Sequence, residues 1–124
     1  MRLGSEWLGR HLPVTIDRPL GSAHPDRPEI IYPVNYGYVP RTIADDGEPI
    51  DVYVIGEPAP LSDTIVFIVA IVRRDDDVED KLVGCRDLIG FSPWEIMQSV
   101  GFMERWFDVT IDTLSGQAHY AKTP

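Results

Sequence analysis

Residues 30–56 of the chain read IIYPVNYGYVPRTIADDGEPIDVYVIG, and this stretch decides the fold. Two aromatic and β-branched segments, residues 30–39 and 52–56, lie on either side of a polar connection that contains Gly and Pro. Aromatic and β-branched residues favour strands, whereas Gly and Pro mark turns. The stretch therefore predicts two strands joined by a tight, acidic turn.

Strand signals continue on both sides of this stretch. Residues 11–17 alternate in polarity, residues 64–73 form the most β-branched run, and residues 81–86 provide another short strand. Residues 18–29 are rich in proline and have no apolar period, which predicts an ordered surface connection. The spacing of these pieces predicts a mainly β domain built as a small closed or nearly closed barrel.

One helix has a clear start signal. Ser92 is a capping residue, Pro93 suits the first helical position, and Glu95 completes a capping box, so we predict a helix over about residues 92–106. An apolar stripe on this helix favours packing against the barrel rather than a cofactor site; it comprises Ile96, Val100, Met103 and Phe107. The segments at 109–112 and 117–121 are compatible with either strands or a tail.

Composition excludes several classes of protein. The 124 residues are 44% hydrophobic and 25% charged, which is typical of one soluble globular domain spanning residues 1–124. With 11 basic and 20 acidic residues, the net charge of −9 argues against nucleic acid as a partner. The longest apolar run, residues 65–72, is too short to span a membrane, and the single cysteine excludes an intramolecular disulfide. We therefore predict a cytoplasmic protein with no membrane or nucleic-acid partner.

The acidic residues are concentrated in two short clusters. Together they hold nine carboxylates, the same number as the net negative charge of the chain. The first cluster is Asp45, Asp46, Glu48 and Asp51, and the second is Asp75, Asp76, Asp77, Glu79 and Asp80. Oxygen ligands without neighbouring His or Cys suit Mg²⁺ or Mn²⁺ better than zinc. The alternative interpretation is a solvated turn and a polar hairpin tip.

Three segments resemble the soluble, family I inorganic pyrophosphatases. Residues 32–56 are similar to that family's aromatic-Pro-x-Asn-Tyr-Gly-Tyr segment followed by D-G-D-P-x-D. The segment VTIDRPLGS at 14–22 resembles the family's acidic strand end, and EDKLV at 79–83 resembles its E-D-x-K-L-V strand start. The resemblance covers residues 12–107.

The resemblance implies an OB-like, five-stranded closed barrel that binds Mg²⁺, or Mn²⁺, and hydrolyses diphosphate to two phosphates. It also implies a homo-oligomer. By resemblance, Glu48 is the general base, and Tyr36 and Lys81 contact phosphate. The implied metal ligands are Asp46, Asp51 and Asp80, with Asp17 and Asp75 as outer or additional ligands.

The chain also departs from the family pattern. Glu48 replaces an aspartate, and a hairpin that carries Lys and Glu, with a following Arg, is missing before residue 30. A Tyr-Lys pair is replaced by Trp106 and Phe107. Candidates to supply the missing positive charge to the substrate are Arg18, His24, Arg27 and Arg41, because arginine binds phosphate well.

The position of the second-cluster ligand stays open between neighbouring residues. Asp80 is favoured, and Asp77 is a further alternative. An alignment on Lys81 makes Glu79 the ligand instead and disfavours Asp75, because a slip of one residue on a strand changes its face.

Two alternatives to diphosphate hydrolysis also stay open: a catalytically weak metal- and phosphate-binding or regulatory module, and a hydrolase of a larger phosphoanhydride. Phosphate release from diphosphate with and without Mg²⁺ separates the enzyme from the binding module.

Overall fold

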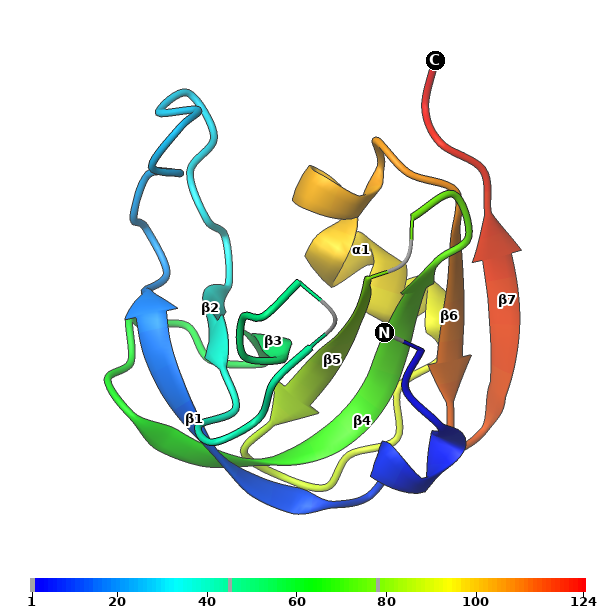
Figure 1. The fold of residues 1–124 in the computed structure, drawn as a ribbon, viewed down its shortest axis with the longest axis horizontal. Coiled ribbons are helices and arrows are strands. Elements are labelled where there is room, and N and C mark those ends of the chain that lie inside the picture. The colour runs from blue at the N-terminus through cyan, green and yellow to red at the C-terminus, as the bar shows by residue number, and fades with distance from the viewer. Residues whose placement is uncertain (1, 45, 78) are drawn as a thin grey trace.

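The strands of this chain close into a ring (Figure 1). The computed structural model describes residues 2–44, 46–77 and 79–124. The strands that these residues form are β1 (His11–Arg18), β2 (Asn35–Tyr38), β3 (Asp51–Ile55), β4 (Thr64–Arg74), β5 (Asp80–Cys85), β6 (Val109–Thr113) and β7 (Gly116–Tyr120).

Five of these strands make the ring, in the order β1-β2-β3-β5-β4, and pairing of β1 with β4 closes it. Strands β3 and β5 run parallel, and the other neighbours in the ring are antiparallel. The ring confirms the predicted mainly β, five-stranded closed architecture. Strands β6 and β7 form a hairpin that extends the sheet beyond β4, so the two segments left open near the C-terminus are strands.

The strand expected over residues 30–39 is much shorter than predicted. Only residues 35–38 form β2, although an isolated bridge joins Ala23 to Ile31. Pro33 and Pro40 explain the difference, because proline has no N–H group to donate to a strand ladder.

The predicted helix is present as α1 (Pro93–Glu104). The Ser92 hydroxyl accepts a hydrogen bond from the Glu95 N–H at 3.2 Å, and the Glu95 carboxylate accepts one from the Ser92 N–H at 3.0 Å. These two bonds confirm the capping box. No helix in the described part of the chain is long and apolar enough to cross a membrane.

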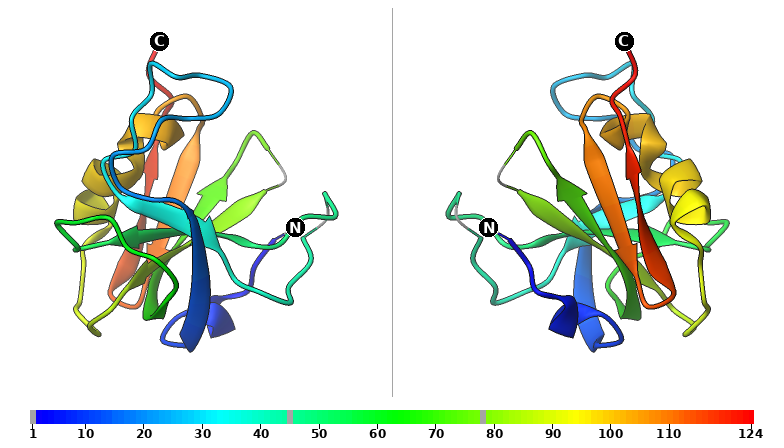
Figure 2. Two further views of the ribbon diagram at one scale, coloured as in Figure 1. Left: turned by 90° about the vertical axis from the view of Figure 1, so that its left-hand side faces the viewer. Right: turned by 90° about the vertical axis from the view of Figure 1, so that its right-hand side faces the viewer.

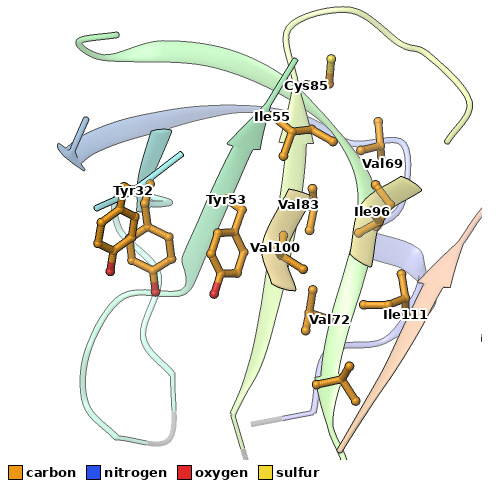
Figure 3. Packing of buried hydrophobic residues seen from close by; sticks show 13 residues of the cluster. Tyr32, Tyr53, Ile55, Val69, Val72, Val83, Cys85, Ile96, Val100 and Ile111 are labelled. Atoms are coloured by element: carbon orange, nitrogen blue, oxygen red, sulfur yellow. The ribbon is translucent and has the colours of Figure 1, made fainter. Parts of the chain in front are cut away.

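Two apolar cores lie on opposite faces of the strands, because alternate residues of a strand point in opposite directions. Val52, Val54 and Leu82 belong to the core that the ring encloses. Tyr53 and Val83 point the other way, into a core that α1 covers with Ile96 and Val100 (Figure 3). Helix α1 thus covers an outer face of the ring.

The N-terminal segment lies on the other side of the sheet from α1 (Figure 2). Leu3, just before the short 3-10 helix η1 (Ser5–Trp7), is buried with the residues that fill the ring. The Gly9 N–H donates to the Ile68 carbonyl at 2.8 Å, and the Ile68 N–H donates to the Arg10 carbonyl at 2.8 Å. The segment is therefore bonded to β4 as well as packed against the core.

Candidate active site

Carboxylates from three parts of the chain line one pocket of about 480 Å³. The pocket lies where β1 ends and β3 begins, beside the turn that carries the first acidic cluster. Its lining residues are Asp17, Arg18, Tyr38, Asp46, Glu48, Pro49 and Asp51. The structure therefore brings together Asp17, Arg18 and the three first-cluster candidates.

A β-bulge places two consecutive residues of β1 at this pocket. Ile16 pairs with Gly37 and Arg18 pairs with Tyr36, so Asp17 is an extra residue without a partner across the ladder. In a regular strand Asp17 and Arg18 would point to opposite faces, whereas a bulge changes the direction of a side chain. The bulge thus lets an anion and a cation line the same pocket.

Gly37 allows β1 to approach closely at this bulge. A Cβ atom built on Gly37 would lie 1.9 Å from the backbone oxygen of Thr15, far inside van der Waals contact. Any side chain at this position would push β1 away from β2. The glycine of the Asn-Tyr-Gly-Tyr segment is therefore explained by packing at the wall of the pocket.

The turn that carries Asp46 and Glu48 is held by local hydrogen bonds. The Ala44 N–H donates to the Glu48 carbonyl at 2.7 Å, and the Glu48 N–H donates to the Asp46 carboxylate at 2.9 Å. Gly47 adopts a φ of 83°, a left-handed conformation that glycine adopts without steric cost. The turn leaves both acidic side chains exposed at the pocket.

Lys81 lies beside the pocket through its contacts with Asp51 and Tyr36. Its Nζ atom donates to the Tyr36 hydroxyl at 2.5 Å and to an Asp51 carboxylate oxygen at 3.3 Å. Burial lowers the pKa of Lys81, although the charge of Asp51 acts in the opposite direction. Burial and, after it, the charge of Asp51 raise the pKa of Tyr36 well above its usual value. The Lys81 ammonium group, which is partly removed from water, and the protonated phenol of Tyr36 therefore both lie beside Asp51.

Arg18 is held at the pocket by the aromatic residues Tyr32 and Tyr36. Its guanidinium donates to the Tyr32 hydroxyl at 2.5 Å and lies 5.7 Å and 5.5 Å from the ring centres of Tyr32 and Tyr36. Burial lowers the pKa of Arg18, but the hydrogen bond and charge of Tyr32 outweigh it and raise the pKa. Arg18 is thus a fixed cation with N–H groups available to a phosphate.

The structure does not bring Asp80 to the pocket. Its carboxylate is fully buried, and it accepts hydrogen bonds from Arg2 at 2.6 Å, from the Leu3 N–H at 2.8 Å and from Arg73 at 3.1 Å. Asp80 and Lys81 are neighbours on β5 and point to opposite faces. Lys81 points to Asp51, so Asp80 points away from the pocket, and the alignment on Lys81 that makes Glu79 the ligand stays a prediction.

Three further candidates also lie away from the lining of the pocket. Asp75 contacts the β6–β7 hairpin, where Thr110 donates to it at 3.0 Å and the His119 ring nitrogen lies 2.9 Å away. The His24 ring accepts hydrogen bonds from the Asp26 and Arg27 N–H groups and stacks on Tyr32, with its ring centre 6.2 Å away.

Arg41, the third, is an exposed residue with a positive φ of 63°. None of the three lines the carboxylate pocket as the structure describes it.

The donor set of the pocket fits a hard divalent cation. Its four acidic side chains offer only oxygen atoms, as Mg²⁺ and Mn²⁺ prefer. In the part of the chain that the structure describes, no three His, Cys, Asp or Glu side chains lie close enough together to hold a metal ion. Partial burial raises the pKa of Asp17, Arg18 lowers it, and Asp51 raises it further. The carboxylates thus repel each other, and a cation would relieve this repulsion.

This repulsion predicts a pH-dependent effect of Asp17→Asn. Because the folded-state pKa of Asp17 is raised above its usual 3.8, ionisation of Asp17 destabilises the metal-free fold as pH rises. We expect Asp17→Asn to raise the melting temperature in EDTA at pH 7 by about 1–3 °C, and not at pH 3. The exposed control Asp87→Asn should change neither value, and equal stabilisation at both pH values would contradict the interpretation.

Two of the residues at the site are not among the sequence candidates. Tyr38 lines the pocket, and Tyr32 holds Arg18. Both belong to the aromatic segment at residues 30–39, and Tyr38 lies two positions after Tyr36 on β2, so strand alternation is the signal that indicates Tyr38. Tyr32 lies before the strand, and its role depends on a loop whose path the sequence does not specify.

Comparisons with known proteins agree with this geometry. Residues 16–85, more than half of the chain, match the model of the family described as inorganic pyrophosphatase. An inorganic pyrophosphatase of Campylobacter jejuni is 40% identical over 82 residues, which are 60% of this chain and 48% of that protein. Inorganic pyrophosphatase 2 of Pseudomonas syringae is 43% identical over 62 residues, which are 46% of this chain and 34% of that protein. Each match spans less than half of the relative's length.

Solved structures show the same fold. An inorganic pyrophosphatase from Ehrlichia chaffeensis aligns with a TM-score of 0.62 at 17% identity, over 90% of this chain and 87% of that one. One from Coxiella burnetii aligns with a TM-score of 0.60 at 19% identity, over 90% and 88%. The matched region 16–85 contains Asp17, Arg18 and the acidic turn of the pocket. Because the family model covers more than half of the chain, this chain belongs to the inorganic pyrophosphatase family.

Proposed function

We propose that the chain hydrolyses inorganic diphosphate to two phosphates at the carboxylate pocket with Mg²⁺ as cofactor. The observation that carries the proposal is the convergence of Asp17, Asp46, Glu48 and Asp51 on one pocket beside Arg18. Diphosphate carries several negative charges, so its hydrolysis needs cations at the phosphates. Lys81, which contacts Asp51, adds a second cation beside this group of acids.

Each residue has a separate role in this proposal. Asp17, Asp46 and Asp51 would hold Mg²⁺, which neutralises phosphate charge and lowers the pKa of a coordinated water. Glu48 accepts a proton from the attacking water, because its exposed carboxylate lines the same pocket. Arg18, Lys81 and the Tyr36 hydroxyl contact phosphate oxygens. Manganese is an alternative cofactor, since it takes similar oxygen ligands.

The direct experiment measures phosphate release from diphosphate by the purified chain, with Mg²⁺ and with EDTA. We expect release with Mg²⁺ and none above the blank with EDTA. No release under either condition, with a chain that unfolds cooperatively, would overturn the proposal.

Asp51→Asn tests the metal site without depending on turnover. In the parent, Mg²⁺ at about 100 times its dissociation constant should stabilise the fold by about 2.7 kcal/mol. We expect Asp51→Asn to lose most of this shift in a thermal melt while the EDTA form stays folded. Asp75→Asn is the matched control, because Asp75 bonds to the β6–β7 hairpin and should leave the shift unchanged. An equal Mg²⁺ shift in parent and Asp51→Asn would place the metal elsewhere.

A further inference from the structure

A buried carboxylate in the last turn of α1 fixes a tyrosine next to the pocket. Glu104 is fully buried, and its Oε2 atom accepts a hydrogen bond from the Tyr53 hydroxyl at 2.6 Å. Arg74 donates to both oxygens of the same carboxylate, each at 2.9 Å. The carboxylate therefore accepts three hydrogen bonds. The Tyr53 side chain is held at its ring by core packing and at its hydroxyl by the bond to Glu104.

The ring of Tyr53 lies next to Lys81 and Tyr36. Its centre is 5.9 Å from the Lys81 Nζ atom and 4.9 Å from the centre of the Tyr36 ring, with an interplanar angle of 63°. Lys81 in turn donates to the Tyr36 hydroxyl and lies 5.0 Å from that ring. Figure 3 shows the Tyr53 ring standing between Tyr32 and the aliphatic residues under α1. Glu104 is thus linked to the ammonium group through Tyr53, first by the hydrogen bond to its hydroxyl and then by the ring, which lies within cation–π distance of Lys81.

Glu104 and Tyr53 are not needed to fill the core. An aliphatic side chain at either position would bury without the cost of dehydrating a carboxylate or a phenol. Beyond the charge partner that Glu104 gives Arg74, these two polar residues add one fixed geometry, because their hydrogen bond restricts the orientation of the Tyr53 side chain. The group that receives this geometry at the pocket is the Lys81 ammonium, which also donates hydrogen bonds to Tyr36 and Asp51.

We propose that Glu104 and Tyr53 are positioning residues that hold the Lys81 ammonium group in place for a phosphate of the substrate. The substrate part of this inference rests on the proposed function, because that function gives Lys81 its phosphate contact. An ammonium group that is fixed before the substrate arrives loses less side-chain entropy on binding.

Lysine dynamics test the inference without substrate. The chain has two lysines, Lys81 and Lys122, so isotope-labelled lysine gives one ε-methylene signal for each residue. The Lys122 side chain is 57% exposed and serves as the exposed reference, whereas the Lys81 side chain is 12% exposed. We expect an order parameter of about 0.8 for Lys81 in the parent and below about 0.6 in Tyr53→Phe. An unchanged value for Lys81 in Tyr53→Phe would overturn the inference.

Kinetics test the consequence for substrate. Tyr53→Phe keeps the ring and removes only the hydroxyl, so the core stays filled. We expect its KM for diphosphate to rise about three- to tenfold, with kcat within about twofold. Tyr120→Phe, far from the pocket beside Trp94, is the control and should leave KM unchanged.

A double-mutant cycle separates positioning from general destabilisation. In a Lys81→Met background, Tyr53→Phe should raise KM no further, because the group it positions is gone. An equal rise in both backgrounds would overturn the inference. If the parent releases no phosphate, the proposed function fails, and the lysine signals still show whether Tyr53 holds Lys81.

Discussion

Glu48→Gln is expected to lower kcat for diphosphate hydrolysis by about 10²–10⁴-fold, the usual contribution of a general base. Glutamine keeps the size of the side chain and much of its hydrogen bonding but does not accept a proton at neutral pH. The hydrogen bonds of the turn run from the Ala44 N–H to the Glu48 carbonyl and from the Glu48 N–H to the Asp46 carboxylate. Neither involves the Glu48 carboxylate. Turn geometry should therefore survive, and the Mg²⁺-induced melting shift should change little.

Two measurements and a control variant make this prediction specific. Steady-state phosphate release gives kcat, and thermal melts with Mg²⁺ report on metal affinity in the same preparation. Glu57→Gln is the control, since Glu57 pairs with Arg86 at 3.1 Å and does not line the pocket. A Glu48→Gln variant as active as the parent would exclude Glu48 as the base. Glu48→Asp should retain or raise activity, because it restores the residue of the family pattern.

Glu104→Leu is expected to lower the free energy of unfolding by about 3–5 kcal/mol, because it leaves a buried arginine without its partner. Arg74 is only 8% exposed and donates two hydrogen bonds to Glu104. Burial lowers the pKa of Arg74, but hydrogen bonding to Glu104 outweighs it, so the guanidinium stays charged. Its next acidic contact, Asp77 at 3.6 Å, is longer and more exposed.

Urea unfolding of single and double variants checks this prediction. The double variant Arg74→Met with Glu104→Leu should lose much less stability than Glu104→Leu alone, since no buried charge remains unpaired. Glu29→Gln, in the exposed pair with Arg27, should cost less than about 1 kcal/mol. A loss below about 1 kcal/mol for Glu104→Leu would mean that Arg74 finds another partner or water.

Local sequence signals predicted the features that depend on neighbours in the chain. The capping box at Ser92 and Glu95 is such a feature, because its residues lie three positions apart. The gathering of Asp46, Glu48 and Asp51 is another, since Gly47 and Pro49 restrict the turn between them. The closed, five-stranded architecture followed less directly, through the resemblance to a known family.

Features that depend on distant contacts could not be predicted. Asp80 is paired with Arg2, 78 positions earlier, and no local pattern connects these residues. The bulge at Asp17 depends on how β1 meets Gly37. For Glu104 a signal existed: it lies four residues after the buried Val100 on the apolar face of α1, where a charged side chain needs a partner.

Closure of the ring also determines how this chain should fold. The pairs His11 with Phe67 and Val14 with Thr64 join segments about fifty residues apart, and the parallel pair of β3 and β5 joins strands that β4 separates along the chain. Pairing such distant segments costs chain entropy before the new contacts stabilise the fold. We therefore expect folding to be slow compared with that of helical domains of this size. The β6–β7 hairpin needs only a tight turn and forms early. Until β1 reaches β4, the unpaired edges of both strands remain open, and in that interval the chain is most prone to aggregate.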